Sequence, residues 1–272
     1  MLKQPLLPTW CPGCGNYFIF SAIKIALTQL KLPMEKIIFT YDVGCCGNMA
    51  DFLLVNGFHG LHGRALPLAA GIKFGYPEAK VFSIIGDGGC FGEGVGHFIS
   101  LCRGNHDLVV LAHDNFFYSL TTGQKSPTTP KGTITPSTPQ GVIEEPFNPV
   151  ANALINSATF VARAFSADIS HLAKIIVDAA NHTGFSFIDI LQPCPTFNKF
   201  RPIDWYKKNI YYLDKTNHNP QDFNSALEKS LQTDKLAVGV FYQTQKTAFH
   251  QHFKADYSNS KINLTSILQD YS

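Results

Sequence analysis

The sequence predicts an α/β fold: a doubly wound, mostly parallel sheet with helices on both faces. Three observations predict it. Short apolar runs of strand length alternate with helix-like stretches from residue 17 to residue 191. This β-α-β-α order is typical of parallel sheets covered by helices. Cysteine, glycine or asparagine follows several of the runs, and ligands of such sheets bind beyond the carboxyl ends of the strands.

In chain order, residues 17–30 (YFIFSAIKIALTQL) read as a helix that stops near Pro33. Residues 36–41 read as a buried strand, and the Ala-, Leu- and Gly-rich stretch 64–75 reads as a tightly packed helix. A strand at 80–85 ends in Gly86. A helix at 94–103 and a strand at 107–113 follow.

The alternation continues after a long loop. The expected elements are a helix near 149–156, a strand at 159–164, a helix at 168–181, a strand at 185–191, a helix at 220–231 and a strand at 237–242. The loop, residues 120–146, is rich in Thr, Pro, Ser and Gly, and loops of this length are usually functional or mobile. Its place after Asn115 favours a cofactor loop over a disordered insertion. We expect a main domain at 1–200 and a more polar extension at 201–272.

Composition bounds the class of protein. Among 272 residues, 45% are apolar and only 15% charged, with 22 Phe. This low charge favours a surface buried against another subunit, with a large core as the alternative. The net charge of +2 comes without basic runs, so no nucleic-acid partner is expected. No apolar run approaches the ~20 residues that span a bilayer, and no signal peptide is recognisable, so we expect a cytoplasmic protein without a membrane partner.

A glycine-rich turn and an asparagine predict a magnesium-bound diphosphate site. Asp87 offers a carboxylate at a strand end, and Gly88 and Gly89 let a diphosphate approach the backbone. Asn115 offers an amide oxygen at the next strand end, and Phe117 can return a backbone carbonyl. Magnesium takes about six oxygen ligands and commonly bridges phosphates. Alone, the GDG run at 86–88 is a weak signal, because turns after strands often look like this.

The cysteines predict a second metal centre. The run TWCPGCGN at 9–16 places Cys11 and Cys14 so that both thiols can bind one centre. The total of seven cysteines is odd, which argues against a disulfide framework. Four thiolates suit either an iron–sulfur cluster or zinc. Structural zinc usually shows two closely spaced pairs, and here the remaining cysteines lie far apart in sequence.

These motifs resemble those of one family. The GDG run with Asn115 resembles the thiamine diphosphate motif. The stretches HGRALP at 62–67 and LTTGQKSPTT at 120–129 resemble the β subunits of 2-oxoacid:ferredoxin oxidoreductases, and WCPGCG at 10–15 is similar to the 2-oxoglutarate-type enzymes. The runs CPTFN at 194–198 and WYK at 205–207 continue a match that covers roughly residues 8–210.

The resemblance implies ligands and cofactors. It implies a thiamine diphosphate-binding fold of the diphosphate type at 1–200, carrying Mg²⁺ and one [4Fe–4S] cluster. The implied cluster ligands are Cys11, Cys14, Cys45 and Cys194. Cys46 competes with Cys45, and the family pattern after Val43-Gly44 selects Cys45.

Further site residues also follow from the resemblance. The cofactor-binding set comprises Gly86, Asp87, Gly88, Gly89, Asn115, Phe117, Leu120 and Thr121. His62 and Arg64 are candidates for a catalytic role, with orientation of a loop as the alternative. Ser119 departs from the family motif, which usually has Gly at this position.

The resemblance implies oxidative decarboxylation of a 2-oxoacid, with 2-oxoglutarate favoured. In this reaction the 2-oxoacid and coenzyme A give an acyl-CoA and carbon dioxide, and electrons pass through the cluster to ferredoxin. It also implies an α subunit, an α2β2 assembly and an extension at 201–272 that contacts a neighbouring subunit. Two alternatives stay open. A non-redox thiamine diphosphate decarboxylase or synthase subunit leaves the four cysteines without a role. A metal- or cluster-binding electron-transfer module without its own chemistry leaves the magnesium motif without one.

Overall fold

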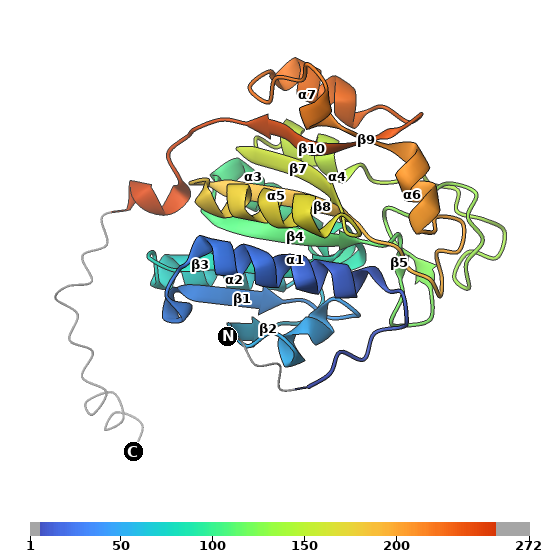
Figure 1. The fold of residues 1–272 in the computed structure, drawn as a ribbon, viewed down its shortest axis with the longest axis horizontal. Helices are drawn as coiled ribbons and strands as arrows, with labels where there is room; N and C mark the ends of the chain where they lie inside the picture. The colour runs from blue at the N-terminus through green and yellow to red at the C-terminus, as the bar shows by residue number, and fades with distance from the viewer. Residues whose placement is uncertain (1–5, 254–272) are drawn as a thin grey trace.

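A computed structural model describes residues 6–253. Its centre is a sheet of eight strands in the order β2-β1-β3-β4-β8-β7-β10-β9 (Figure 1). All neighbouring strands pair in parallel except β7 and β10, which are antiparallel. The strands are β1 (Ile37–Tyr41), β2 (Asn56–His59), β3 (Lys80–Gly86), β4 (Leu108–Asp114), β7 (Phe160–Phe165), β8 (Phe185–Leu191), β9 (Ile210–Tyr212) and β10 (Leu236–Gln243).

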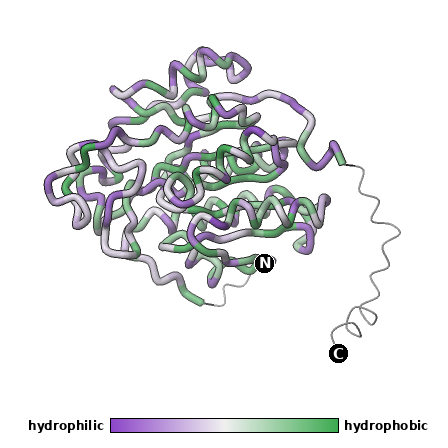
Figure 2. Tube along the Cα trace, turned by 180° about the vertical axis from the view of Figure 1, so that it is seen from behind, coloured by the Kyte–Doolittle hydropathy of each residue, from purple (hydrophilic) through white to green (hydrophobic). Residues whose placement is uncertain are grey.

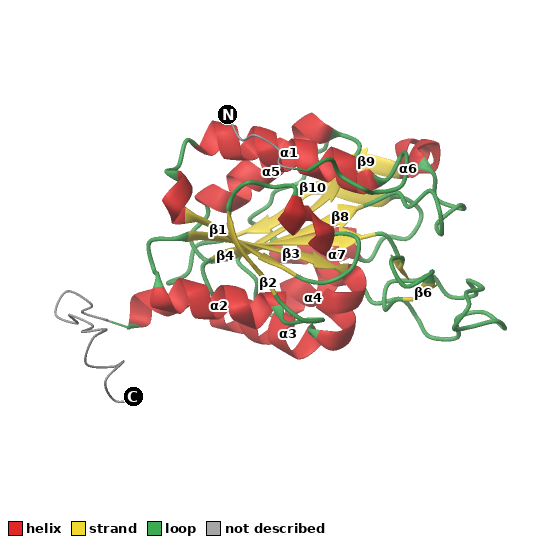
Figure 3. Ribbon diagram, turned by 90° about the horizontal axis from the view of Figure 1, so that it is seen from below, coloured by secondary structure: helices red, strands yellow, loops and turns green. Residues whose placement is uncertain are grey.

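Helices cover both faces of this sheet (Figure 3). On one face α1 packs along α5, and on the other α2, α3 and α4 form a row. The helices are α1 (Gly15–Leu30), α2 (Ala65–Gly75), α3 (Val95–Gly104), α4 (Pro149–Ile155), α5 (Ile169–Asn181), α6 (Ile203–Asn209) and α7 (Phe223–Ser230). The observed architecture confirms the predicted doubly wound α/β fold.

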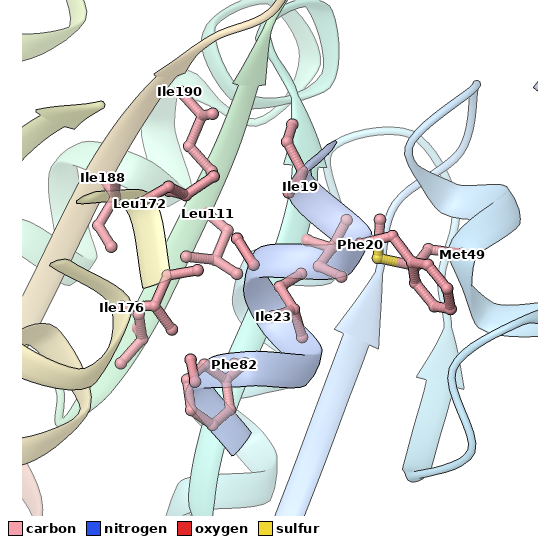
Figure 4. Packing of buried hydrophobic residues seen from close by; sticks show 14 of the residues in the cluster. Ile19, Phe20, Ile23, Met49, Phe82, Leu111, Leu172, Ile176, Ile188 and Ile190 are labelled. Carbon is pink, nitrogen blue, oxygen red and sulfur yellow. The ribbon is translucent and has the colours of Figure 1, made fainter. Parts of the chain in front are cut away.

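The core has two large apolar layers, one on each side of the sheet, and a smaller cluster around Tyr206. Every position of β1, β4, β7 and β8 is buried, as expected for strands covered on both faces. In Figure 2 the hydrophobic residues gather in these inner elements and the hydrophilic ones on the outer loops. Figure 4 shows α1 contributing Ile19, Phe20 and Ile23 to the layer that it shares with α5.

Local signals fix where several helices start and end. The Asp168 side chain accepts a hydrogen bond from the backbone N–H of His171 and so caps α5. Asn148 caps α4 in the same way, and Pro149 occupies its first turn, where no backbone donor is needed. α1 ends at Leu30, and the next residue, Lys31, takes the left-handed conformation with φ of 50°. Each predicted helix and strand lies within a few residues of its expected place.

Among the α-helices and the strands of the main sheet, three elements were not expected. The strand β2 is a fully exposed run of four residues, and β9 has only three. The helix α6 covers the WYK run at 205–207. The strands β9 and β10 belong to the main sheet, so residues 210–243 continue the fold beyond the expected boundary at 200. The role of 201–272 in contacting another subunit stays a prediction, and its last part, 254–272, lies outside the described residues. No helix within 6–253 is long and apolar enough to cross a membrane.

The long loop at 120–146 folds back onto the sheet edge. A short hairpin pairs β5 (Phe117–Tyr118) with β6 (Gln124–Lys125) in antiparallel register. Beyond it, Phe147 N–H donates to the Pro127 carbonyl at 2.8 Å. Hydrogen bonds therefore hold this loop near both of its ends.

Candidate functional site

The carboxyl ends of four neighbouring strands form the candidate site. Because β1, β3, β4 and β8 run in parallel, the residues that follow them meet at one edge of the sheet. Gly86 pairs with His113 in register, which sets Asp87 opposite Asp114 on the next strand. A cavity of about 130 Å³ opens at this edge, and Asp87, Asn115 and Phe117 all line it.

The turn after β3 is a cradle that admits only glycine. A Cβ atom on Gly88 would lie 2.2 Å from Cε1 of Tyr118, and one on Gly89 would lie 2.0 Å from Oδ2 of Asp42. Residues Gly89–Glu93 then form a π-helical turn that leads into α3. Backbone exposed at such a turn can approach a phosphate group closely. The diphosphate expected from the glycine pattern would lie against this turn.

Asp87 is buried among hydroxyl groups from the long loop. Its Oδ2 accepts hydrogen bonds from Ser126 Oγ and, at 2.7 Å, from Thr128 Oγ1. Thr128 Oγ1 also lies 2.8 Å from Oδ1 of Asp114. One hydroxyl has one hydrogen, so it donates to only one of these carboxyl groups at a time. The loop thus fixes the orientation of the Asp87 carboxyl group from behind the cavity.

Burial raises the pKa values of both the Asp87 and the Asp114 carboxyl groups. Burial raises the pKa of Asp87 to about 6. Burial and the neighbouring Asp87 raise the pKa of Asp114 well above its ordinary value. Two carboxylates held this close favour a shared proton or a cation. The oxygen-rich pocket with excess negative charge therefore fits a divalent cation such as Mg²⁺.

Asn115 is held by the backbone around it. Its Oδ1 accepts hydrogen bonds from Phe117 N–H at 3.0 Å and from Ser119 Oγ at 3.0 Å. Its own carbonyl accepts from Asn198 Nδ2 at 3.2 Å. Phe116 takes a φ of 71°, a left-handed conformation that turns the chain sharply after β4. This turn brings Asn115 to the wall of the cavity that Asp87 also lines.

Four cysteines line a second cavity of about 110 Å³ beside the first. They come from the N-terminal loop, from the end of β1 and from the end of β8, and they are Cys11, Cys14, Cys45 and Cys194. Folding therefore brings together the widely spaced cysteines that the family resemblance had grouped. Cys46 does not line this cavity; its thiol is buried 3.7 Å from the Val43 carbonyl. The geometry favours Cys45 over Cys46 as the ligand.

Polar groups surround three of these sulfurs. Thr196 Oγ1 donates to Cys11 Sγ at 3.3 Å, and Gln192 Nε2 donates to Cys14 Sγ at 3.9 Å. Ser119 Oγ lies 3.5 Å from Cys194 Sγ. Such donors stabilise thiolates and tune the clusters that thiolates bind.

Burial and neighbouring thiols make isolated thiolates costly here. Burial raises the pKa of Cys14 to about 12, and the Cys194, Cys45 and Cys11 thiols add to the effect. Burial and the Cys194 and Cys11 thiols likewise raise the pKa of Cys45 to about 11. Across residues 6–253, no three His, Cys, Asp or Glu side chains are arranged to hold one metal ion.

The two cavities are neighbours. Four residues line both of them: Cys45, Asn115, Ser119 and Leu120. A group bound in one cavity is therefore separated from a group in the other by single side chains. This adjacency suits a pair of cofactors between which electrons pass.

The other predicted residues take different places. His62, Leu120 and Thr121 line the first cavity with exposed side chains. Arg64 does not line it; the guanidinium group is exposed and donates to the Glu93 carbonyl at 3.3 Å. The location of Arg64 fits the loop-orienting alternative better than contact with a bound molecule.

Sequence reasoning missed several residues of the site. Asp42, at the end of β1, lines the first cavity and accepts from Gly63 N–H at 2.7 Å. Burial raises its pKa to about 6. His113 also lines this cavity, and burial lowers its pKa to about 3, so its ring is neutral at physiological pH. In the sequence, only their place at strand ends marked Asp42 and His113 as site residues. No sequence pattern marked the Ser126 and Thr128 hydroxyls of the loop.

The fold and the site together define an α/β protein of the thiamine diphosphate-binding class. Residues 42–190 match the family model of the thiamine pyrophosphate enzyme C-terminal TPP-binding domain, and residues 194–256 match that of the C-terminal part of the pyruvate ferredoxin oxidoreductase β subunit. The chain belongs to the family of 2-oxoacid:ferredoxin oxidoreductase β subunits and is thus part of an oxidoreductase.

Individual relatives agree with this assignment. The chain is 40% identical over 266 residues to the 2-oxoacid:ferredoxin oxidoreductase β subunit of Saccharolobus solfataricus, a match that covers 93% of this chain and 87% of that one. It is 35% identical over 241 residues to the 2-oxoglutarate synthase subunit KorB of Archaeoglobus fulgidus, with 88% and 86% covered. A solved structure of 2-oxoglutarate:ferredoxin oxidoreductase from Magnetococcus marinus, with 2-oxoglutarate, coenzyme A and succinyl-CoA bound, superposes with a TM-score of 0.89 at 32% identity, covering 99% and 89% of the two chains.

Proposed function

We propose that this chain holds the diphosphate end of thiamine diphosphate, its Mg²⁺ ion and a [4Fe–4S] cluster in an enzyme that oxidatively decarboxylates a 2-oxoacid. The adjacency of the two cavities carries the proposal, because a redox enzyme with these two cofactors needs them side by side. The reaction is conversion of a 2-oxoacid and coenzyme A to an acyl-CoA and carbon dioxide. Two electrons leave singly and reduce ferredoxin.

The residues of the first cavity would bind the cofactor. Asp87 and Asn115 would supply a carboxylate and an amide oxygen to Mg²⁺, and Phe117 would supply its backbone carbonyl. The Gly88-Gly89 turn would accept the diphosphate, since neither glycine carries a side chain of its own that would cover its backbone N–H group. Leu120 and Thr121 would border the cofactor at the cavity mouth.

The residues of the second cavity would bind the cluster through four thiolates. Trp10 supports this ligand set, because its indole N–H donates to the Cys45 carbonyl at 2.7 Å and so fixes the loop after β1. When bound, thiamine diphosphate accepts the electron pair released on decarboxylation, and the cluster carries electrons one at a time. The protein supplies the short separation between them.

His62 is the side chain best placed to exchange a proton with a bound molecule. Its ring is exposed in the first cavity, close enough to the Asp42 carboxyl group to favour the ionised form of that acid. A general acid or base must reach the reacting groups, and a histidine lining the cavity meets this condition. Arg64 would act indirectly by fixing the loop after β3 through Glu93.

The β-subunit names of the relatives support an α subunit as partner. An α2β2 assembly in the cytoplasm belongs to the same proposal, and the low proportion of charged residues agrees with a large interface between subunits. The relatives named as 2-oxoglutarate enzymes support 2-oxoglutarate as the substrate. The non-redox alternative gains no support, because it gives the four-thiol cavity no role.

Activity assays test this proposal. The chain is produced with its α subunit under anaerobic conditions and assayed with a panel of 2-oxoacids, coenzyme A and ferredoxin. We expect ferredoxin reduction that depends on coenzyme A and is fastest with 2-oxoglutarate. The chain alone is expected to be inactive. Decarboxylation without any reduction of the acceptor would instead indicate a non-redox thiamine enzyme.

A further inference from the structure

Ser119 is the only residue of the loop 116–123 whose side chain contacts a candidate ligand from each site in the described structure. Its hydroxyl lies 3.0 Å from Oδ1 of Asn115 and 3.5 Å from Sγ of Cys194. It is half-buried and lines both cavities.

The hydroxyl cannot serve both neighbours as a donor. A serine has a single O–H hydrogen, and both a carbonyl oxygen and a thiolate only accept. Rotation about the Cβ–Oγ bond moves this hydrogen from one acceptor to the other without moving any heavier atom. Ser119 therefore has two arrangements that differ only in which ligand receives its hydrogen bond.

Occupancy of the magnesium site decides between them. The Asn115 Oδ1 atom has two lone pairs, and Phe117 N–H already uses one of them at 3.0 Å. An Mg²⁺ ion bound to this oxygen takes the other lone pair. The Ser119 hydroxyl then loses its acceptor, and the Cys194 sulfur is the remaining one within reach.

On this basis, and resting on the proposed function, we infer that Ser119 is a positioning residue that links the two sites. Binding of Mg²⁺ and diphosphate turns its hydroxyl toward Cys194, and the added hydrogen bond makes the cluster easier to reduce. Hydrogen bonds to cluster sulfurs raise the reduction potential, because reduction places more negative charge on the sulfurs. The cluster thus becomes a better electron acceptor when the cofactor that supplies electrons is in place.

The reduction potential of the cluster tests this inference without using turnover. The complex with the α subunit is titrated anaerobically and followed spectroscopically, with and without thiamine diphosphate and Mg²⁺. For the wild type we expect loading to favour the reduced cluster about tenfold, which is about 59 mV for one electron. Ser119→Ala should abolish this difference, and Ser119→Thr should retain it because the hydroxyl remains.

Thr196→Val is the matched control. Thr196 donates to Cys11 Sγ at 3.3 Å but does not line the first cavity. Its loss should lower the potential equally with and without the cofactor and leave the loading-dependent difference intact. A Ser119→Ala variant that keeps the wild-type difference overturns the inference, as does a loaded wild type that shows no difference. A wild type that binds no cluster or no cofactor instead refutes the proposed function itself.

Discussion

Replacing Asp87 with asparagine should change stability and cofactor binding in opposite directions. The substitution preserves the shape of the side chain and removes its charge. Asp87 is 1% exposed, and it shares the hydroxyl of Thr128 with the buried Asp114. The site thus holds two buried carboxyl groups that share one hydroxyl donor. Asparagine can still accept hydrogen bonds from the Ser126 and Thr128 hydroxyls through its amide oxygen.

The magnitude follows from the pKa of Asp87. Burial raises it from the ordinary value of 3.8 to about 6. One pKa unit corresponds to about 1.4 kcal/mol, so the ionised carboxylate at neutral pH opposes folding by on the order of 3 kcal/mol. The pKa of Asp87 is higher in the folded state than in the unfolded state. Its protonated form therefore contributes fully to the free energy of unfolding below pH 3.8, and this contribution is lost as pH rises through about 6. The variant escapes this loss.

In the cofactor-free complex, Asp87→Asn should therefore raise the free energy of unfolding at pH 7.5 by up to about 3 kcal/mol, and the gain should shrink toward pH 4.5. Affinity for Mg²⁺ and thiamine diphosphate should fall at least ~100-fold, because a carboxylate ligand is lost. Urea unfolding at the two pH values and calorimetric titration measure both effects.

Asp204→Asn, at an exposed carboxylate on α6, is the control and should change neither quantity. An Asp87→Asn variant that is less stable at pH 7.5, or that binds the cofactor as tightly as the wild type, would refute the reasoning. In the first case the carboxylate is a structural group, and in the second it is not a ligand of the ion.

Three further predictions concern the same edge of the sheet. Cys45→Ser should lose the iron and the visible absorption of the complex, whereas Cys46→Ser should keep both. Iron analysis distinguishes the two variants, and the reverse result would assign the ligand to Cys46. Gly88→Ala should weaken thiamine diphosphate binding at least ~10-fold, because its Cβ would lie 2.2 Å from the Tyr118 ring and overpacking costs about 1–3 kcal/mol. Gly71→Ala, on α2 with no atom within 4 Å of the added Cβ, should instead stabilise the protein by about 0.5–1 kcal/mol, as unfolding measurements would show. His62→Ala should slow turnover ~100-fold or more with cofactor content unchanged, and unaltered kcat would exclude a role in proton transfer.

Most of the sheet could be predicted because its strands are long apolar runs that end in glycine or polar residues. The strand β2, with the sequence Asn-Gly-Phe-His, is exposed at every position and has no such run. It forms because the edge of β1 offers it a partner in register, which is a property of the tertiary structure. The helix α6 was missed for a similar reason, since its buried Tyr206 packs against residues that only the fold brings near.

Apart from Cys11 and Cys14, which share one short motif, the convergence of the candidate site was predictable where its residues follow strands. Asp87, Asn115 and Cys194 stand at strand ends, and parallel pairing brings such positions together. The hydroxyls of Ser126 and Thr128 reach Asp87 from a loop whose path no local pattern reveals. The choice of Cys45 over Cys46 came from the family resemblance, and the turn after β1 agrees with it, because this turn directs one thiol to the four-cysteine cavity and buries the other.

One measurement tests most directly whether this chain unites the two cofactors. The anaerobic complex, loaded with thiamine diphosphate and Mg²⁺, is mixed with 2-oxoglutarate in the absence of ferredoxin, and its visible spectrum is recorded. We expect about four iron atoms per copy of this chain and bleaching of the cluster absorption. The Asp87→Asn variant is expected to show no bleaching. A colourless protein with stoichiometric zinc, or a cluster that 2-oxoacids never bleach, would contradict the account.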